Sequence, residues 1–186
     1  MQLFTKEGII KQLNIAVDAF EQTGRKLSDE QFFAKSEDKW SAAEQMQHLI
    51  LAVKPLNKAF GMPRLILRLL YGKPNKNSSI NYQELVKKYQ GKLERGAKAS
   101  TAFIPKPIST DADKENIINS FAKNYIDFTA NLADINEYDL DNYQLPHPIL
   151  GKLSLREMLY FTAYHVEHHH NIVKERLVTK VASKRV

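Results

Sequence analysis

The 186-residue sequence contains no cysteine, which excludes disulfide bonds, thiolate metal sites and cysteine nucleophiles. It also lacks any run of about 18 uninterrupted apolar residues, the length that a membrane-spanning helix needs. The most apolar region, residues 49–71, is interrupted by lysines, arginines and two prolines. Lys6, Glu7 and Lys11 lie where a signal peptide would have an unbroken apolar centre. We therefore expect a cytoplasmic protein that does not associate with a membrane.

Hydrophobic residues make up 43% of the chain and charged residues 26%, which is ordinary for a globular protein and excludes extensive disorder. The length fits one domain of roughly 100–200 residues, so we expect a single domain over residues 1–186 with its core at about 5–178. The net charge is +6, but acidic residues lie between the basic ones along the whole chain. Dispersed charge favours a solvated surface, and no nucleic-acid partner is expected.

Four segments have the hydrophobic period of an amphipathic helix. They lie at about 5–23, 41–55, 112–135 and 154–178. Capping boxes, in which a serine is followed three residues later by glutamine or glutamate, mark helix starts at Ser28, Ser41 and Ser154. Pro55 should kink or end the second long helix, because proline has no backbone N–H.

The connections between these segments differ in length and in character. Short helices are expected at 28–35, 62–71 and 81–95, extended chain at 103–109, and loops at 72–79 and 138–152. Four long helices with such connections predict an all-α fold, a four-helix bundle with extra short helices in its long connections.

The histidines carry the clearest functional signal. Four of the six lie between His165 and His170, within the last predicted helix. Because a helix turns by about 100° per residue, His165 and His169 should face the bundle together, with His170 at the border and His168 turned away. Two imidazoles at this spacing can bind one metal ion. A polar core is the alternative, since buried imidazoles need partners for both ring nitrogens.

A metal site would need a third ligand, and the sequence offers two candidates. His147 lies in a loop between two prolines, where it could be a ligand or a turn residue. His48 lies on the second long helix, one turn after Glu44. Glu44 is either the helix cap alone or an acceptor that holds the His48 ring in place.

Three stretches resemble, in the same order, the DinB-like (DinB/YfiT-like) superfamily. Residues 40–49 contain a tryptophan, serine, glutamate and histidine at the start of the second helix. Residues 147–157 form a proline–glycine loop, and residues 161–169 contain the histidines four apart. The resemblance spans about residues 5–178 and implies a four-helix bundle with an up-down-down-up arrangement.

The resemblance also implies a function. One divalent metal ion (nickel, zinc, iron or manganese in different members) would be held by His48, His165 and His169, with an open position for water, thiol or substrate. Family activities include thiol-dependent transfer and hydrolysis, so a small-molecule substrate and a low-molecular-weight thiol cosubstrate are expected. Many members have a glutamine one turn after the last ligand, where this chain has residues 171–173, Asn-Ile-Val.

Two other functions and an assembly remain open from the sequence. A non-catalytic, stress-related binding module could use the same bundle. Nucleic-acid binding is a third possibility, prompted by the positive charge, but no basic face interleaved with aromatic residues supports it. The apolar segment 62–70 predicts a homodimer, because one chain would leave part of it uncovered.

Overall fold

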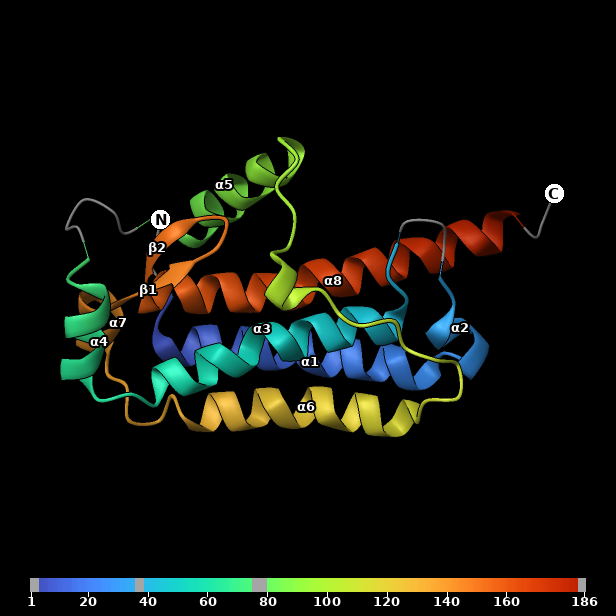
Figure 1. The fold of residues 1–186 in the computed structure, drawn as a ribbon, viewed down its shortest axis with the longest axis horizontal. Helices are drawn as coiled ribbons and strands as arrows, with labels where there is room; N and C mark the ends of the chain where they lie inside the picture. The colour runs from blue at the N-terminus through green and yellow to red at the C-terminus, as the bar shows by residue number, and fades with distance from the viewer. Residues whose placement is uncertain (1–3, 36–38, 75–79, 184–186) are drawn as a thin grey trace.

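The computed structural model describes residues 4–35, 39–74 and 80–183, with side chains described as far as Leu177. Four long helices in these residues form a bundle (Figure 1). They are α1 (Lys6–Lys26), α3 (Ala42–Phe60), α6 (Lys114–Ala130) and α8 (Leu155–Ser183). Helices α1 and α8 run in one direction and α3 and α6 in the other (Figure 1). This up-down-down-up arrangement confirms the predicted all-α bundle.

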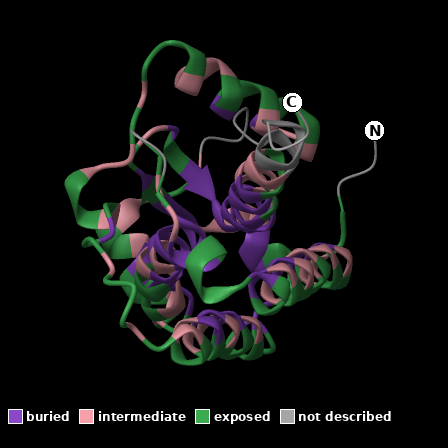
Figure 2. Cartoon of the chain, turned by 90° about the vertical axis from the view of Figure 1, so that its right-hand side faces the viewer, coloured by how far each residue is buried: buried purple, intermediate pink, exposed green. Residues whose placement is uncertain are grey.

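Packing between the long helices places α3 beside α8. Helix α1 packs against α6 and α8, and α3 packs against the same two helices, so α1 and α3 lie on one diagonal. The buried segments of the four helices face one another (purple in Figure 2), and their apolar side chains form the core. The rings of Phe20 and Phe121, and those of Phe60 and Phe128, meet edge to face with centroids 5.5 and 5.4 Å apart. Such pairs contribute about 0.5–1.5 kcal/mol beyond the burial of their area.

Three helices begin at the predicted capping boxes. In each box the serine hydroxyl accepts a hydrogen bond from a backbone N–H, and the glutamine or glutamate side chain accepts one from the serine N–H. This satisfies two of the N–H groups that a helix start leaves without partners. The pairs are Ser28–Gln31 before α2 (Asp29–Phe33), Ser41–Glu44 before α3, and Ser154–Glu157 before α8.

Two helix ends differ from the prediction. Pro55 does not end α3, which continues to Phe60. The proline is exposed, whereas Ala59 and Phe60 beyond it are buried, and this packing keeps the chain helical. Helix α6 ends at Ala130, whereas the sequence predicts an end at Ile135. The last apolar residues of the predicted helix are still buried in the core, but they lie in the turns that follow α6.

A long crossover, residues 61–113, joins α3 to α6. Because α3 and α6 are neighbours that run in the same direction, the chain must run back along the bundle after α3 before α6 can begin (Figure 1). The crossover contains α4 (Arg64–Tyr71), α5 (Tyr82–Glu94) and a short 3-10 helix, η1 (Thr101–Phe103). Helix α5 packs against α8, and η1 packs against α3. Residues 75–79 of the predicted loop lie outside the described residues.

The prediction of a loop at 138–152 is wrong. This stretch contains α7 (Glu137–Asn142) and a hairpin of β1 (Gln144–His147) and β2 (Gly151–Ser154). Proline is tolerated in β1 because a two-stranded sheet consists of edge strands. Gly151 has a φ of 82°, which only glycine adopts without strain, and it begins β2 after the turn.

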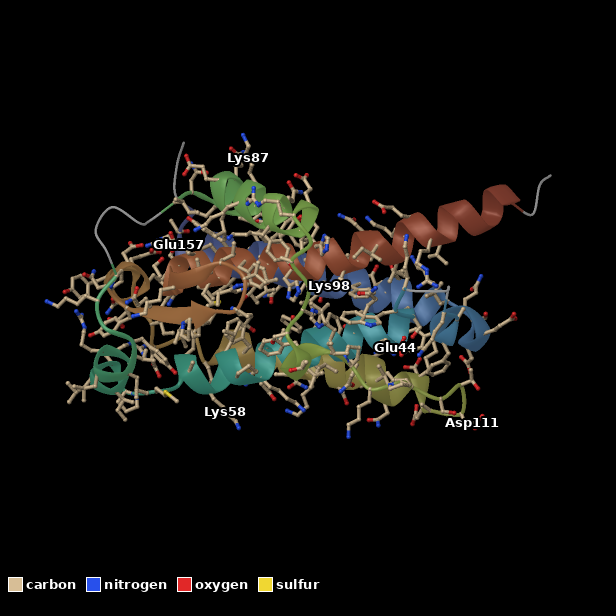
Figure 3. The ribbon with its side chains drawn as sticks, turned by 45° about the horizontal axis from the view of Figure 1, so that its top comes forward. Glu44, Lys58, Lys87, Lys98, Asp111 and Glu157 are labelled. Atoms are coloured by element: carbon tan, nitrogen blue, oxygen red, sulfur yellow. The ribbon has the colours of Figure 1, made fainter. Side chains whose placement is uncertain are left out.

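Most charged side chains lie on the outside of the bundle, whereas Glu44, Asp139, Arg156 and Glu157 are buried. Figure 3 shows Lys58, Lys87 and Asp111 on different sides of the molecule. Several charges are paired within one helix, as Lys123 and Asp127 are at 2.9 Å. In the part of the chain that the structure describes, no helix combines the length and the apolar character that crossing a membrane requires.

Candidate metal centre

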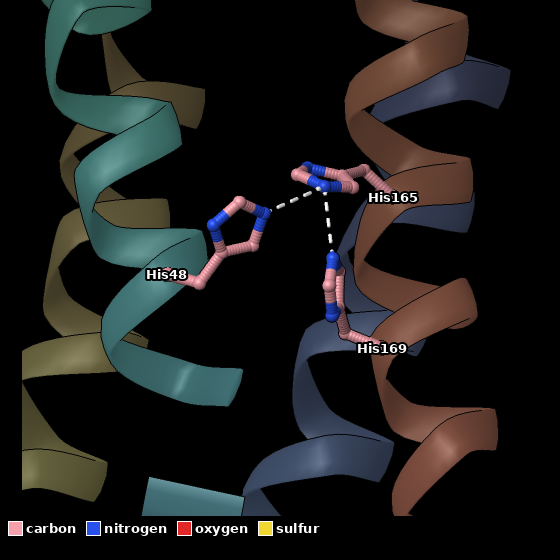
Figure 4. A group of neighbouring side chains, drawn as sticks. All are labelled: His48, His165 and His169. Carbon is pink, nitrogen blue, oxygen red and sulfur yellow. Dashed lines mark hydrogen bonds between the residues drawn. The ribbon is translucent and has the colours of Figure 1, made fainter. Parts of the chain in front are cut away.

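Three histidines meet in the interior of the bundle. His48 projects from α3, and His165 and His169 project from α8 toward it (Figure 4). The Nε2 atom of His165 lies 3.1 Å from Nε2 of His48 and 3.0 Å from Nε2 of His169. All three residues are buried, with exposed fractions of 4–6%. The structure therefore brings together the two histidines of one helix face and one of the two candidates for a third ligand.

Hydrogen bonds on the far side of two rings fix where their protons lie. Nδ1 of His48 lies 2.6 Å from the carbonyl oxygen of Phe103, and Nδ1 of His169 meets the side-chain oxygen of Gln45. Because an oxygen of either kind only accepts, each Nδ1 carries the proton and donates it. In a neutral imidazole this leaves Nε2 with a free lone pair.

The three Nε2 atoms fit a cation better than they fit one another. Those of His48 and His169 both direct lone pairs at the same place, and a neutral His165 has a single N–H to offer. A divalent ion would accept lone pairs from all three rings at once. Three neutral imidazoles are also the protein ligands of zinc sites that keep an open position. The residues present thus form a cluster that could hold a metal ion, with donor atoms within 4.8 Å of one another.

The electrostatic environment keeps these rings neutral. Burial lowers the pKa of His165 and His169 well below 6.5, and the neighbouring histidines lower it further. Burial also lowers the pKa of His48, with an additional contribution from His168. Since only the neutral ring can bind a metal, the lone pairs are available at neutral pH.

Glu44 caps its helix and does not hold His48. One carboxylate oxygen accepts a hydrogen bond from the Ser41 N–H at 3.0 Å, and the other pairs with Lys35 at 2.6 Å. The acceptor for His48 is instead the carbonyl oxygen of Phe103, at the end of η1 in the crossover. Of the two interpretations that the sequence allowed for Glu44, the geometry matches the cap.

Two groups that orient the rings were not predicted from the sequence. Gln45 lies three residues before His48, so both face the interior from successive turns of α3, and this spacing could have revealed it. The Phe103 carbonyl could not have been found in this way, because any residue has such a group. Trp40 covers the cluster from outside, with its ring 4.9 Å from that of His48.

The remaining histidines of α8 contact other helices. His170 is buried, bonds to the hydroxyl of Thr23 at 2.7 Å and stacks on Phe20. His168, predicted to turn away from the bundle centre, is half-buried beside Tyr89 of α5. Tyr164, one turn before His168, is half-buried against the same helix.

A cavity of about 540 Å³ lies beside the three-histidine cluster. It is within the range of roughly 300–1,000 Å³ that small-molecule sites occupy. Its wall is largely aliphatic and aromatic, and all three histidines of the cluster line it. The apolar lining residues include Val53 and Leu56 of α3, Leu93 of α5, Phe103 and Ile104 of the crossover, Leu145 of β1, and Met158 and Phe161 of α8.

His147, the other candidate for the third ligand, lies apart from the cluster at the end of β1. Its Nδ1 accepts hydrogen bonds from the N–H groups of Ile149 and Leu150, both at 3.1 Å, which is the turn role that the sequence left open. Its ring packs on Phe161, with centroids 4.2 Å apart, and lines the same cavity. Burial lowers the pKa of His147 to about 4.

Comparisons with known proteins agree with this fold. The sequence matches no curated protein. A solved structure with a similar fold is that of YfiT from Bacillus subtilis, described as "a probable metal-dependent hydrolase with an unusual four-helix bundle topology". The two are 15% identical with a TM-score of 0.59, over 95% of this chain and 91% of YfiT, a likeness that shows the fold. The family model of the DinB superfamily matches residues 12–173, which is most of the chain, and the protein therefore belongs to the DinB superfamily.

Proposed function

We propose that this protein is a metal-dependent enzyme that acts on a small molecule at the three-histidine cluster. The observation that carries the proposal is the convergence of three buried Nε2 atoms beside the cavity. A divalent ion bound there would supply the Lewis acidity that lowers the pKa of a bound water or keeps a bound thiol as thiolate. Nickel, zinc, iron and manganese are all candidates, because imidazole ligands suit several of them.

The residues around the cluster have separate roles in this proposal. Phe103 and Gln45 hold two of the rings with their Nε2 atoms directed inward. Groups that orient metal-bound histidines in this way also raise their basicity. The apolar walls of the cavity exclude water and strengthen electrostatic interactions inside it.

Hydrolysis is the first reaction to test, since YfiT is described as a probable hydrolase. Thiol-dependent transfer is the second. Because the chain has no cysteine, the thiol would come from a low-molecular-weight cosubstrate. Assays of the metal-loaded protein with and without added thiol separate the two reactions. A protein that binds metal and converts no substrate in either assay would be a binding module instead.

Metal content tests the proposal directly. Plasma mass spectrometry on tag-free protein, incubated with zinc or nickel salts and dialysed, should find about one equivalent of metal. His48→Ala, His165→Ala and His169→Ala should each lose it, whereas His170→Gln should keep it because His170 faces Thr23. A parent protein without metal after this incubation would refute the proposed function.

We also propose that the protein self-associates through α4 and acts in the cytoplasm. Four aliphatic side chains of α4 remain 42–75% exposed, namely Leu65, Ile66, Leu69 and Leu70. A contiguous apolar surface of this kind favours contact with a second copy. Analytical ultracentrifugation should detect a dimer that Leu69→Lys weakens, and a parent that stays monomeric at high concentration would contradict the proposal.

A further inference from the structure

The tautomer of His147 is fixed by the hairpin turn. Two main-chain N–H groups, those of Ile149 and Leu150, both donate to its Nδ1. A nitrogen that accepts hydrogen bonds cannot carry a proton, so the proton of the neutral ring is on Nε2. His147 therefore has one N–H donor whose position is set by the backbone.

The ring that carries this donor lines the cavity. His147 lines the cavity together with His165, and the ring of Phe161 contacts both, with centroids 4.2 and 4.7 Å away. Among the described residues, none accepts a hydrogen bond from Nε2 of His147. Two hydroxyl groups of the same wall already have acceptors within the protein. The Tyr125 hydroxyl donates to the carbonyl of Leu49, and the Thr162 hydroxyl donates to that of Met158.

We propose that His147 is a substrate-binding residue that donates a hydrogen bond from Nε2 to a neutral carbonyl oxygen of the substrate. The substrate class is then an apolar molecule that carries an ester, amide or ketone carbonyl. This inference rests on the proposed function for its catalytic meaning, since the reacting group would lie at the three-histidine cluster.

The side chains around His147 favour a neutral carbonyl over a charged acceptor, although the exposed Lys98 also lines the cavity. The walls near His147 are formed by Phe161, Leu145 and Tyr89, and a single N–H of a neutral ring cannot compensate the desolvation of an anion. A carbonyl oxygen loses much less on leaving water and needs one good donor. A site that provides such a donor also rejects analogues without the oxygen, because the donor would then be buried without a partner.

The first experiment examines the tautomer in the parent protein and needs no variant. Long-range proton–nitrogen NMR spectra of the metal-free, full-length protein at neutral pH distinguish protonated from unprotonated ring nitrogens. We expect the His147 ring to have an unprotonated Nδ1 and a protonated Nε2. A proton on Nδ1 would overturn the proposal.

The second experiment measures recognition with two probes of nearly equal shape. Acetophenone and ethylbenzene differ mainly by the carbonyl oxygen, and their dissociation constants can be measured by NMR titration of the metal-free protein. His147→Asn is the informative variant. Its side-chain oxygen is as many bonds from the backbone as Nδ1, so it can accept the N–H groups of Ile149 and Leu150. Its Nδ2 lies one bond short of the Nε2 position, so no donor remains there.

The expected result is selective. Acetophenone should bind His147→Asn roughly three- to tenfold more weakly than the parent, which is the loss of one hydrogen bond, and ethylbenzene should bind both equally. An unchanged affinity for acetophenone, or an equal loss for both probes, would overturn the proposal. These measurements use no metal, so their failure is separate from a failure of the metal-content experiment, which tests the proposed function.

Discussion

Gln45→Met tests whether the groups behind the histidines set the metal affinity. Methionine has an unbranched chain of similar length, so it fills the same buried space, where Gln45 is 3% exposed. The substitution removes the acceptor from Nδ1 of His169 and leaves every candidate ligand in place. It therefore separates the orientation of a ring from the presence of a ligand.

Two independent estimates of the free-energy cost of this substitution agree. A buried N–H that loses its only acceptor costs about 1–3 kcal/mol. Removal of a group that orients a metal-bound histidine weakens metal binding by roughly 10–100-fold, which is about 1.4–2.8 kcal/mol. We expect the zinc affinity of Gln45→Met to fall within this range, and the metal-free protein to lose about 1–3 kcal/mol of unfolding free energy.

Competition with a chromophoric chelator measures the affinity, and urea unfolding measures the stability. Gln47→Met is the matched control, because Gln47 is half-buried on the same helix, two residues further along. This control should leave the zinc affinity unchanged. If Gln45→Met bound zinc as tightly as the parent, the role given to Gln45 would be wrong.

Three further predictions concern stability. Because the pKa of His147 is lowered from 6.5 to about 4, the unfolded chain binds its proton first as the pH falls, and stability decreases from about pH 6.5 toward pH 4. At pH 5 this protonation should lower the free energy of unfolding by about 2 kcal/mol. In urea unfolding, the stability of His147→Asn should therefore fall by about 2 kcal/mol less than that of the parent over the same pH range. Gly24→Val should lower stability by about 1–3 kcal/mol in thermal unfolding, since a Cβ there would lie 2.8 Å from the end of Met46; an unchanged melting temperature would contradict this. Ser41→Ala should cost about 1 kcal/mol by removing the cap of α3, and an equal stability of parent and variant would show that Glu44 caps the helix alone.

Local patterns in the sequence predict the bundle well. The capping boxes place the starts of three helices because they satisfy backbone groups within a few residues, without help from the rest of the fold. The spacing of His165 and His169 predicts that they share a face, since helix geometry is itself local. The structure agrees on both points.

Features that depend on distant parts of the chain could not be predicted in this way. The hairpin of β1 and β2 is short and contains a proline, so it has little strand signal and is stabilised by packing against α8. Residues 138–152 therefore resemble a loop in the sequence. The choice between His48 and His147 depends on which elements flank α8, and the bond from His48 to the Phe103 carbonyl depends on the path of the crossover.

The wide separation of the histidines along the chain has a consequence for synthesis. His48 meets His165 across 117 residues, so one histidine of the cluster leaves the ribosome long before the other two. At roughly 5–20 residues per second, the delay is about 6–23 seconds. Throughout that interval the nascent chain has His48 but lacks α8, the helix that packs against both α1 and α3. A chain interrupted before α8 therefore has one of the three imidazoles, and the complete cluster can form only after α8 has been synthesised.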